Sequence, residues 1–101
     1  MIKYSAEVAT AQKNGSPIVA LESTIISHGL PRPKNLIVAQ EVEAIVRNAG
    51  ATPATIAVID GTVCVGLDQK QLERIATDDQ IVKASVRDLA LIQAGKKSAA
   101  T

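Results

Sequence analysis

The stretch ATIAVIDGTVCV, residues 54–65, contains two short apolar runs on either side of Asp60-Gly61. β-Branched side chains dominate both runs, which favours extended backbone. Asp-Gly suits a two-residue turn in which both central residues need positive φ. We therefore predict a hairpin of two strands, 54–59 and 62–65.

Before this hairpin, the sequence predicts a long helix and a further strand. The segment Asn35–Ala49 places apolar residues at the three-four spacing of one helix face, with Asn35 as the expected N-terminal cap and Gly50 as the stop. The run Ile18–Leu21 is continuously apolar and of strand length. Such a run is typical of a strand buried on both faces, as in a parallel sheet.

The rest of the chain alternates polar turns with short periodic segments. The sequence predicts helices over Ser5–Lys13, Asp68–Ala76 (with Gln71 completing a capping box) and Arg87–Ala94, an extended segment over Ile81–Ser85, and irregular backbone over Ser27–Pro33. Alternating helices and strands indicate the α/β class. We expect a single domain, residues 1–101, with a layered α/β/α architecture and a mixed, largely parallel sheet.

Composition excludes several classes of function. The chain has 101 residues, 47% of them hydrophobic and 21% charged, with 11 basic against 10 acidic side chains. A net charge of +1 provides no basic field for nucleic acid, and a lone aromatic residue, Tyr4, provides no base-stacking surface. One cysteine, Cys64, excludes an internal disulfide framework and a cysteine-based zinc site. No apolar run is long enough for a membrane span or a signal-peptide core, so we predict a cytoplasmic protein without membrane or nucleic-acid partners.

Glu22 directly follows the apolar run Ile18–Leu21 and precedes Ser23-Thr24. Ligands of open α/β sheets bind beyond the carboxyl ends of the strands. A partly desolvated carboxyl group at such a place has a raised pKa, as a general acid requires. The alternative is that Glu22 leaves the sheet into solvent or pairs with a lysine.

Lys83 lies in the extended segment Ile81–Ser85, so it either runs along a sheet edge or points at an anion. Ser85, Arg87 and Asp88 follow at a helix start, where the same two interpretations apply: a capped terminus with surface charge, or an anion site.

Three other features favour structural interpretations. His28, the only histidine, lies in a Gly/Pro-rich loop, where a turn role is favoured over a catalytic one. Cys64 lies between two valines and is expected to be buried. Lys96-Lys97 suits a solvated pair at a helix end.

A resemblance extends these inferences. The run VALESTIISHG, residues 19–29, followed by Pro31 and Pro33, closely resembles the N-terminal signature of the pseudouridine-5′-phosphate glycosidase family, which includes the indigoidine-synthase-A-like proteins. Further matching segments are Glu41-Val42-Glu43, Gly50–Ala57, Val65-Gly66-Leu67, Lys83 with Ser85, and Arg87-Asp88-Leu89.

The resemblance implies a reversible reaction in which pseudouridine 5′-phosphate and water give uracil and ribose 5-phosphate, with a divalent metal, typically manganese. The family is understood to hold the opened ribose as a lysine imine. By this match Glu22 is the proton donor and Lys83 binds substrate, whereas His28 receives no defined role. The resemblance also implies a cytoplasmic homo-oligomer, a trimer.

The resemblance covers only the N-terminal third of the family pattern, so this chain is expected to be an incomplete piece of the fold. The imine-forming lysine and the metal-binding aspartate belong to later segments, which leaves no metal ligand among these residues. Val86, Ala90 and Lys97-Ser98 replace the usual arginine, proline and Asn-Gly. The alternative function is therefore a non-catalytic remnant or phosphosugar-binding fragment of a truncated gene. We expect the 101 residues alone to lack glycosidase activity and to leave a sheet edge and an apolar helix face uncovered.

Overall fold

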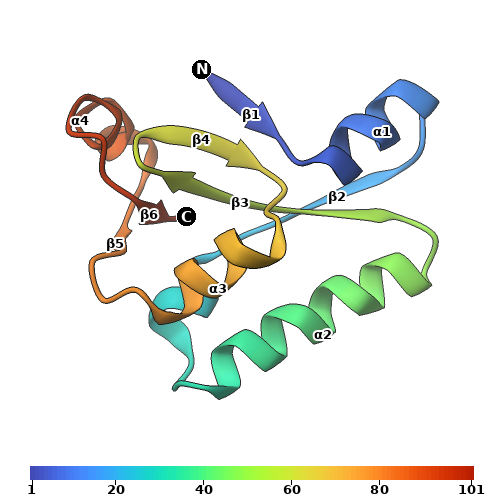
Figure 1. Cartoon of the computed structure of the whole chain (residues 1–101), viewed down its shortest axis with the longest axis horizontal. Helices are drawn as coiled ribbons and strands as arrows, with labels where there is room; N and C mark the ends of the chain where they lie inside the picture. Colours follow the sequence, from blue (N-terminus) through green and yellow to red (C-terminus); the bar gives the residue numbers. More distant parts are fainter.

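The computed structural model describes every residue from Met1 to Thr101. Along the chain the elements are β1 (Ile2–Tyr4), α1 (Ala6–Asn14), β2 (Ile18–Leu21), the π-helical turn η1 (Ile25–Gly29), α2 (Lys34–Asn48), β3 (Thr52–Ile59), β4 (Thr62–Val65), α3 (Gln69–Thr77), β5 (Val82–Lys83), the 3-10 turn η2 (Val86–Asp88), α4 (Leu89–Ala94) and β6 (Ala99–Ala100) (Figure 1). None of the helices is long and apolar enough to cross a membrane.

The predicted hairpin is confirmed and forms the centre of the sheet. β3 and β4 pair antiparallel from Ile56 opposite Val65 to Ile59 opposite Thr62. Asp60 and Gly61 both have positive φ, 48° and 84°, as the tight turn requires. A side chain at position 61 would also lie too close to a neighbour, because its Cβ would be 2.9 Å from the Cα of Lys96.

The sheet is mixed, as expected. Its strand order is β1-β4-β3-β6-β5, and β2 pairs with the first half of β3. Three pairings are parallel (β1 with β4, β2 with β3, β5 with β6) and two are antiparallel (β3 with β4 and with β6). The short strands β1 and β6 were not predicted, because neither has enough residues for a period of two to be recognised.

Helices cover both faces of the sheet, which confirms the layered α/β/α prediction. In Figure 1, α2 and α3 lie together below the hairpin, and α4 lies above it at the left. The larger core lies between the sheet and α2, α3 and η1, and it includes Ala57, Leu72 and Ile75. The smaller core includes Val58 and Ile92 and lies on the α4 side. Ala57 and Val58 are consecutive, so β3 alternates between the two cores as a strand must.

Two predicted helix ends are confirmed and one is wrong. The Ser5 hydroxyl caps α1 by accepting from the Val8 N–H at 3.1 Å, and Asp68 with Gln71 forms the capping box of α3. Asn35 does not cap α2, because that helix begins one residue earlier and Asn35 is buried inside its first turn. A buried amide requires hydrogen-bond partners, and this one finds them on other elements.

Three further expectations need correction. Ile25–Gly29 forms a π-helical turn that overlaps the start of the stretch expected to be irregular, Ser27–Pro33, and only Val82–Lys83 of the extended segment pairs as a strand. β2 is not buried on both faces: Ile18 and Val19 are 36% and 41% exposed. The physical reason is that β2 pairs with β3 alone, so no second strand of this chain lies beside it.

Candidate functional site

Glu22 lies immediately beyond the carboxyl end of β2, as predicted, at one end of an apolar groove. The groove has a volume of about 150 Å³ and runs between β2, η1 and α2. The side chain of Glu22 is nevertheless exposed. The expected desolvation of the Glu22 carboxyl is therefore wrong in this structure, because no part of the chain covers it.

Ser23 holds the backbone next to Glu22 in place. It is fully buried, and its hydroxyl donates to the Ile56 carbonyl of β3 and accepts from the Thr101 N–H at 3.0 Å. The Ser23 N–H in turn donates to the Thr101 carbonyl. These bonds fix the end of β2 to both β3 and the end of β6. The sequence identified Ser23 only as a neighbour of Glu22, because its partners are distant in the chain.

Hydrogen bonds to α2 and α3 hold η1, the turn that follows Glu22. Asn35, 1% exposed, donates its amide N–H groups to the Ile26 carbonyl at 3.0 Å and to the Ala76 carbonyl at 2.7 Å. The Ser27 hydroxyl donates to the Ile75 carbonyl at 2.7 Å. The Ile75 and Ala76 carbonyls belong to the last turn of α3, where carbonyl groups have no partner within the helix. Helix α3 thus positions the turn after the candidate acid.

Lys83 lies on β5, which runs antiparallel to β2 and ends near the same place, the end of β6. Lys83 lies opposite Ala100 of β6, and the next residue's N–H, that of Ala84, donates to the Ala100 carbonyl at 2.9 Å. Because Ser23 is bonded to Thr101, the carboxyl ends of β2 and β5 meet at the end of β6. The structure therefore brings the segments that carry Glu22 and Lys83 together. The Lys83 side chain is exposed.

The segment after Lys83 has the capped-terminus arrangement. The Ser85 N–H and hydroxyl both donate to one Asp88 carboxylate oxygen, at 3.0 and 2.9 Å. These two hydrogen bonds lower the pKa of Asp88. The Asp88 carboxylate thus accepts the Ser85 hydrogen bonds that an external anion would receive in the alternative interpretation.

The structure gives no site role to the other residues that the sequence singled out. His28 is exposed within η1, and Lys96 and Lys97 are exposed at the end of α4. Cys64 is 2% exposed, and burial raises the pKa of its thiol, as expected for a structural cysteine.

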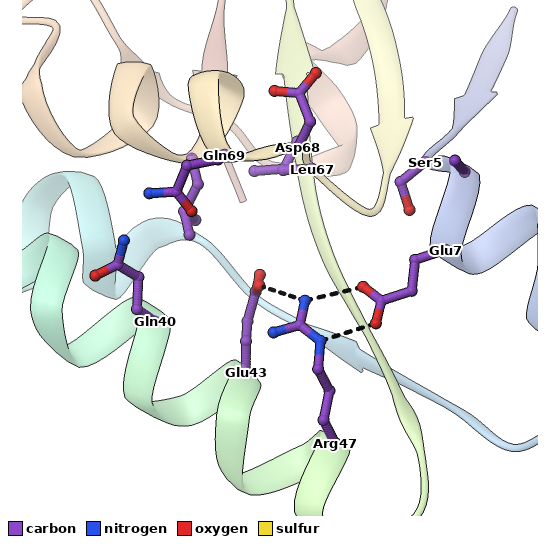
Figure 2. A pocket seen from close by; sticks show the side chains of 10 residues that line it. Ser5, Glu7, Gln40, Glu43, Arg47, Leu67, Asp68 and Gln69 are labelled. Carbon is purple, nitrogen blue, oxygen red and sulfur yellow. Dashed lines mark hydrogen bonds and ion pairs between the residues drawn. The ribbon is translucent and has the colours of Figure 1, made fainter.

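A second hollow, of about 420 Å³, lies between α1, α2 and the start of α3. Figure 2 shows Arg47 between two carboxylates there. It donates to both oxygens of Glu7, at 2.8 and 2.9 Å, and to Glu43 at 3.2 Å. Glu43 is 6% exposed and also accepts from the Thr55 hydroxyl at 2.6 Å.

This network was not predicted, although the spacing of Glu43 and Arg47 on one helix is a signal for such a pair. The hydrogen bond from Arg47 lowers the pKa of Glu7. One carboxylate oxygen of Glu43 accepts from Arg47 and the other from Thr55, so the buried charge of Glu43 is paired. Through these contacts and the Arg47–Glu7 pair, the network joins α1, α2 and β3.

The chain holds no group of three or more His, Cys, Asp or Glu side chains that could bind a metal ion. The resemblance assigns the ligand of the manganese ion to later segments of the family pattern, so the metal stays a prediction.

Comparison with known proteins agrees with the sequence resemblance. The profile of the family described as "Indigoidine synthase A like protein" matches residues 7–101. This chain belongs to the indigoidine synthase A-like family. The family assignment predicted from residues 19–29 is thus confirmed.

Two curated relatives of this family member show how far the match extends. The pseudouridine-5′-phosphate glycosidase of Salinispora tropica is 55% identical over 100 residues, which is 99% of this chain and 31% of the relative. The enzyme of the same name from Staphylococcus aureus is 55% identical over 100 residues, 99% of this chain and 33% of the relative. The chain therefore spans about a third of the length of these relatives.

Two solved structures of similar proteins match the fold. The prealnumycin C-glycosynthase AlnA, crystallised in complex with ribulose 5-phosphate, is 39% identical with a TM-score of 0.85 over 100% of this chain and 32% of its own. An indigoidine synthase A-like protein from Thermotoga maritima is 28% identical with the same TM-score and the same coverage of both chains. These matches show that the fold of this chain corresponds to about a third of each of those two structures.

Proposed function

We propose that this chain forms the part of a pseudouridine-5′-phosphate glycosidase site that supplies Glu22 as proton donor and Lys83 as a substrate contact. The proposed reaction is the reversible cleavage of pseudouridine 5′-phosphate to uracil and ribose 5-phosphate. The observation that carries the proposal is the meeting of the carboxyl ends of β2 and β5 at Thr101, in a chain 55% identical to glycosidases of that name.

The chemistry assigns different tasks to the two residues. Cleavage of the bond between the uracil carbon and ribose C1′ adds the elements of water, so the uracil carbon gains a hydrogen and C1′ gains an oxygen. A carboxyl group in the position of Glu22 can deliver that proton. Lys83 carries a positive charge suited to a phosphorylated sugar. The AlnA neighbour binds a sugar phosphate, which supports this class of ligand.

The proposal places other functions outside these residues. The amine that forms the imine and the ligands of a divalent metal, manganese by resemblance, are expected from the part of the family fold that this chain does not match. The cytoplasmic location and the trimeric assembly belong to the same proposal.

One observation favours a second candidate function, a phosphosugar-binding piece without catalysis. Glu22 is exposed, so nothing in this chain shields its carboxyl group from water. The glycosidase proposal therefore requires that Glu22 is covered in the active assembly.

A chimera tests the proposal. Residues 1–101 replace the matched segment of the Salinispora tropica relative, and uracil release from pseudouridine 5′-phosphate is measured with manganese present. We expect activity in the chimera and a fall in kcat of about 10²–10⁴-fold in Glu22→Gln, the range for loss of general acid–base catalysis. The matched control is Glu73→Gln, an exposed carboxylate on α3. Equal activity of the two variants would refute the role of Glu22.

A further inference from the structure

Ser23 directly follows Glu22, and its side chain is 0% exposed. Its hydroxyl lies between two main-chain groups from distant parts of the chain, the Ile56 carbonyl at 2.5 Å and the Thr101 N–H at 3.0 Å. A hydroxyl donates one hydrogen bond while it accepts another, so Ser23 satisfies both groups at once. Alanine at this position would leave both groups without that partner in a place that water does not reach.

The backbone is held to β3 on both sides of Glu22. Leu21 pairs with Thr55 in the ladder between β2 and β3, which holds the residue before Glu22. The Ser23 hydroxyl bonds to Ile56, the next residue of β3, which holds the residue after Glu22. The Glu22 side chain itself is exposed, so packing does not fix it. The direction in which its carboxyl group points therefore depends on the backbone that Ser23 holds.

The same hydroxyl connects Glu22 to the part of the sheet that carries Lys83. Thr101, whose N–H donates to Ser23, directly follows Ala100, and Ala100 pairs with Lys83 between β6 and β5. One buried side chain thus joins the ends of β2 and β6. A change at Ser23 would alter the position of Glu22 relative to Lys83.

We propose that Ser23 is a positioning residue for Glu22, which acts by fixing the backbone of the proton donor and touches no substrate. This inference rests on the proposed function, because the position of Glu22 affects turnover only if Glu22 transfers the proton. Misplacement of a reacting group by about 1 Å can reduce a rate about 10²-fold. We therefore expect Ser23→Ala to lower kcat roughly 10- to 100-fold with little change in KM.

The first test measures backbone motion in the 101-residue chain and needs no activity. Nitrogen-15 relaxation gives the order parameter of the Glu22 amide, and circular dichroism checks that each variant is folded. We expect about 0.85 in the unmodified chain and less than about 0.6 in Ser23→Ala, the values of rigid and flexible backbone. An unchanged order parameter in folded Ser23→Ala would overturn the proposal. If Ser23→Ala does not fold, Ser23→Cys, whose thiol is a weaker donor and acceptor, is judged by the same criterion.

Ser98→Ala is the matched control. Ser98 is also buried, 7% exposed, and its hydroxyl also accepts from a main-chain group, the Asp60 N–H at 2.9 Å. It precedes β6, whereas Thr101 follows that strand. Ser98→Ala should therefore leave the order parameter of Glu22 unchanged, and an equal fall in both variants would overturn a specific role for Ser23.

The second test is a double-mutant cycle in the chimera described above. A positioning residue loses its effect when the group that it positions is removed. Ser23→Ala should therefore lower kcat by less than about twofold in a chimera that already carries Glu22→Gln. An equal loss with and without Glu22→Gln would overturn the proposal, because a serine that only stabilises the fold would act in both backgrounds.

The two tests separate this inference from the proposed function. If Glu22→Gln leaves the chimera fully active, or the chimera has no activity, the proposed function is wrong, and the order parameters decide whether Ser23 holds Glu22. If Glu22→Gln lowers kcat and the loss caused by Ser23→Ala is the same in both backgrounds, the proposed function stands and the positioning role is overturned.

Discussion

Replacing Asn35 with alanine tests how the turn after Glu22 is held. In the structure, the Asn35 amide donates to the carbonyls of Ile26 and Ala76, and its oxygen accepts from the Leu36 N–H at 2.9 Å. Each lost hydrogen bond costs about 1 kcal/mol, and a buried acceptor left without a partner costs more. The Ala76 carbonyl keeps one partner, the Arg32 Nε–H at 3.0 Å. The net loss of unfolding free energy is therefore about 2–3 kcal/mol.

Urea unfolding followed by circular dichroism at low protein concentration is the suitable assay, because the chain has one aromatic residue and little intrinsic fluorescence. With an m-value of about 1–2 kcal/mol/M for a small domain, the midpoint should fall by about 1–3 M at unchanged m. Asn48→Ala, an exposed position at the end of α2, is the control and should change stability by less than about 0.5 kcal/mol. Equal midpoints for the two variants would refute the reasoning that Asn35 fixes the turn.

The remaining predictions concern charge, turn geometry and substrate binding. Because Arg47 lowers the pKa of Glu7 below its ordinary value of 4.5, the pair stabilises the fold above that pH and ceases to do so as pH falls through the lowered value. Thermal unfolding of Glu7→Gln should therefore depend less on pH below 4.5 than that of the unmodified chain, and added salt should reduce the difference. Gly61→Ala should cost about 1–3 kcal/mol in urea unfolding, because φ is 84° and the new Cβ would lie 2.9 Å from Lys96. In the chimera, Lys83→Met should raise KM for the phosphorylated substrate about tenfold with a smaller change in kcat, and unchanged values of both would exclude a ligand role.

Local features of the fold could be predicted because their causes lie within a few residues. The hairpin follows from Asp60-Gly61, whose backbone preferences match the turn whatever surrounds it. The capping box of α3 likewise involves Asp68 and Gln71, three positions apart. Such contacts need no knowledge of the tertiary fold.

Features that depend on distant partners could not be predicted. Asn35 has the side chain of a helix cap, but its partner Ala76 is 41 positions away, and tertiary contact overrides the local preference. Ser23 is held by Thr101, 78 positions away. The apolar pattern of Ile18–Leu21 correctly predicts a strand, but its burial depends on tertiary neighbours, and in this structure β2 pairs with β3 alone.

The candidate site divides in the same way. The position of Glu22 beyond a strand end follows from the sequence of β2 alone. The approach of the Lys83 segment depends on β6, which the sequence did not reveal. The role of each residue came from the family resemblance and remains a proposal.

The central claim is that Glu22 donates a proton during cleavage, and the steady-state kinetics of uracil release by the chimera test it most directly. Glu22→Gln should reduce kcat about 10²–10⁴-fold and change KM for pseudouridine 5′-phosphate little, because proton donation acts in the transition state and not in substrate binding. A Glu22→Gln chimera that keeps its turnover would contradict the claim.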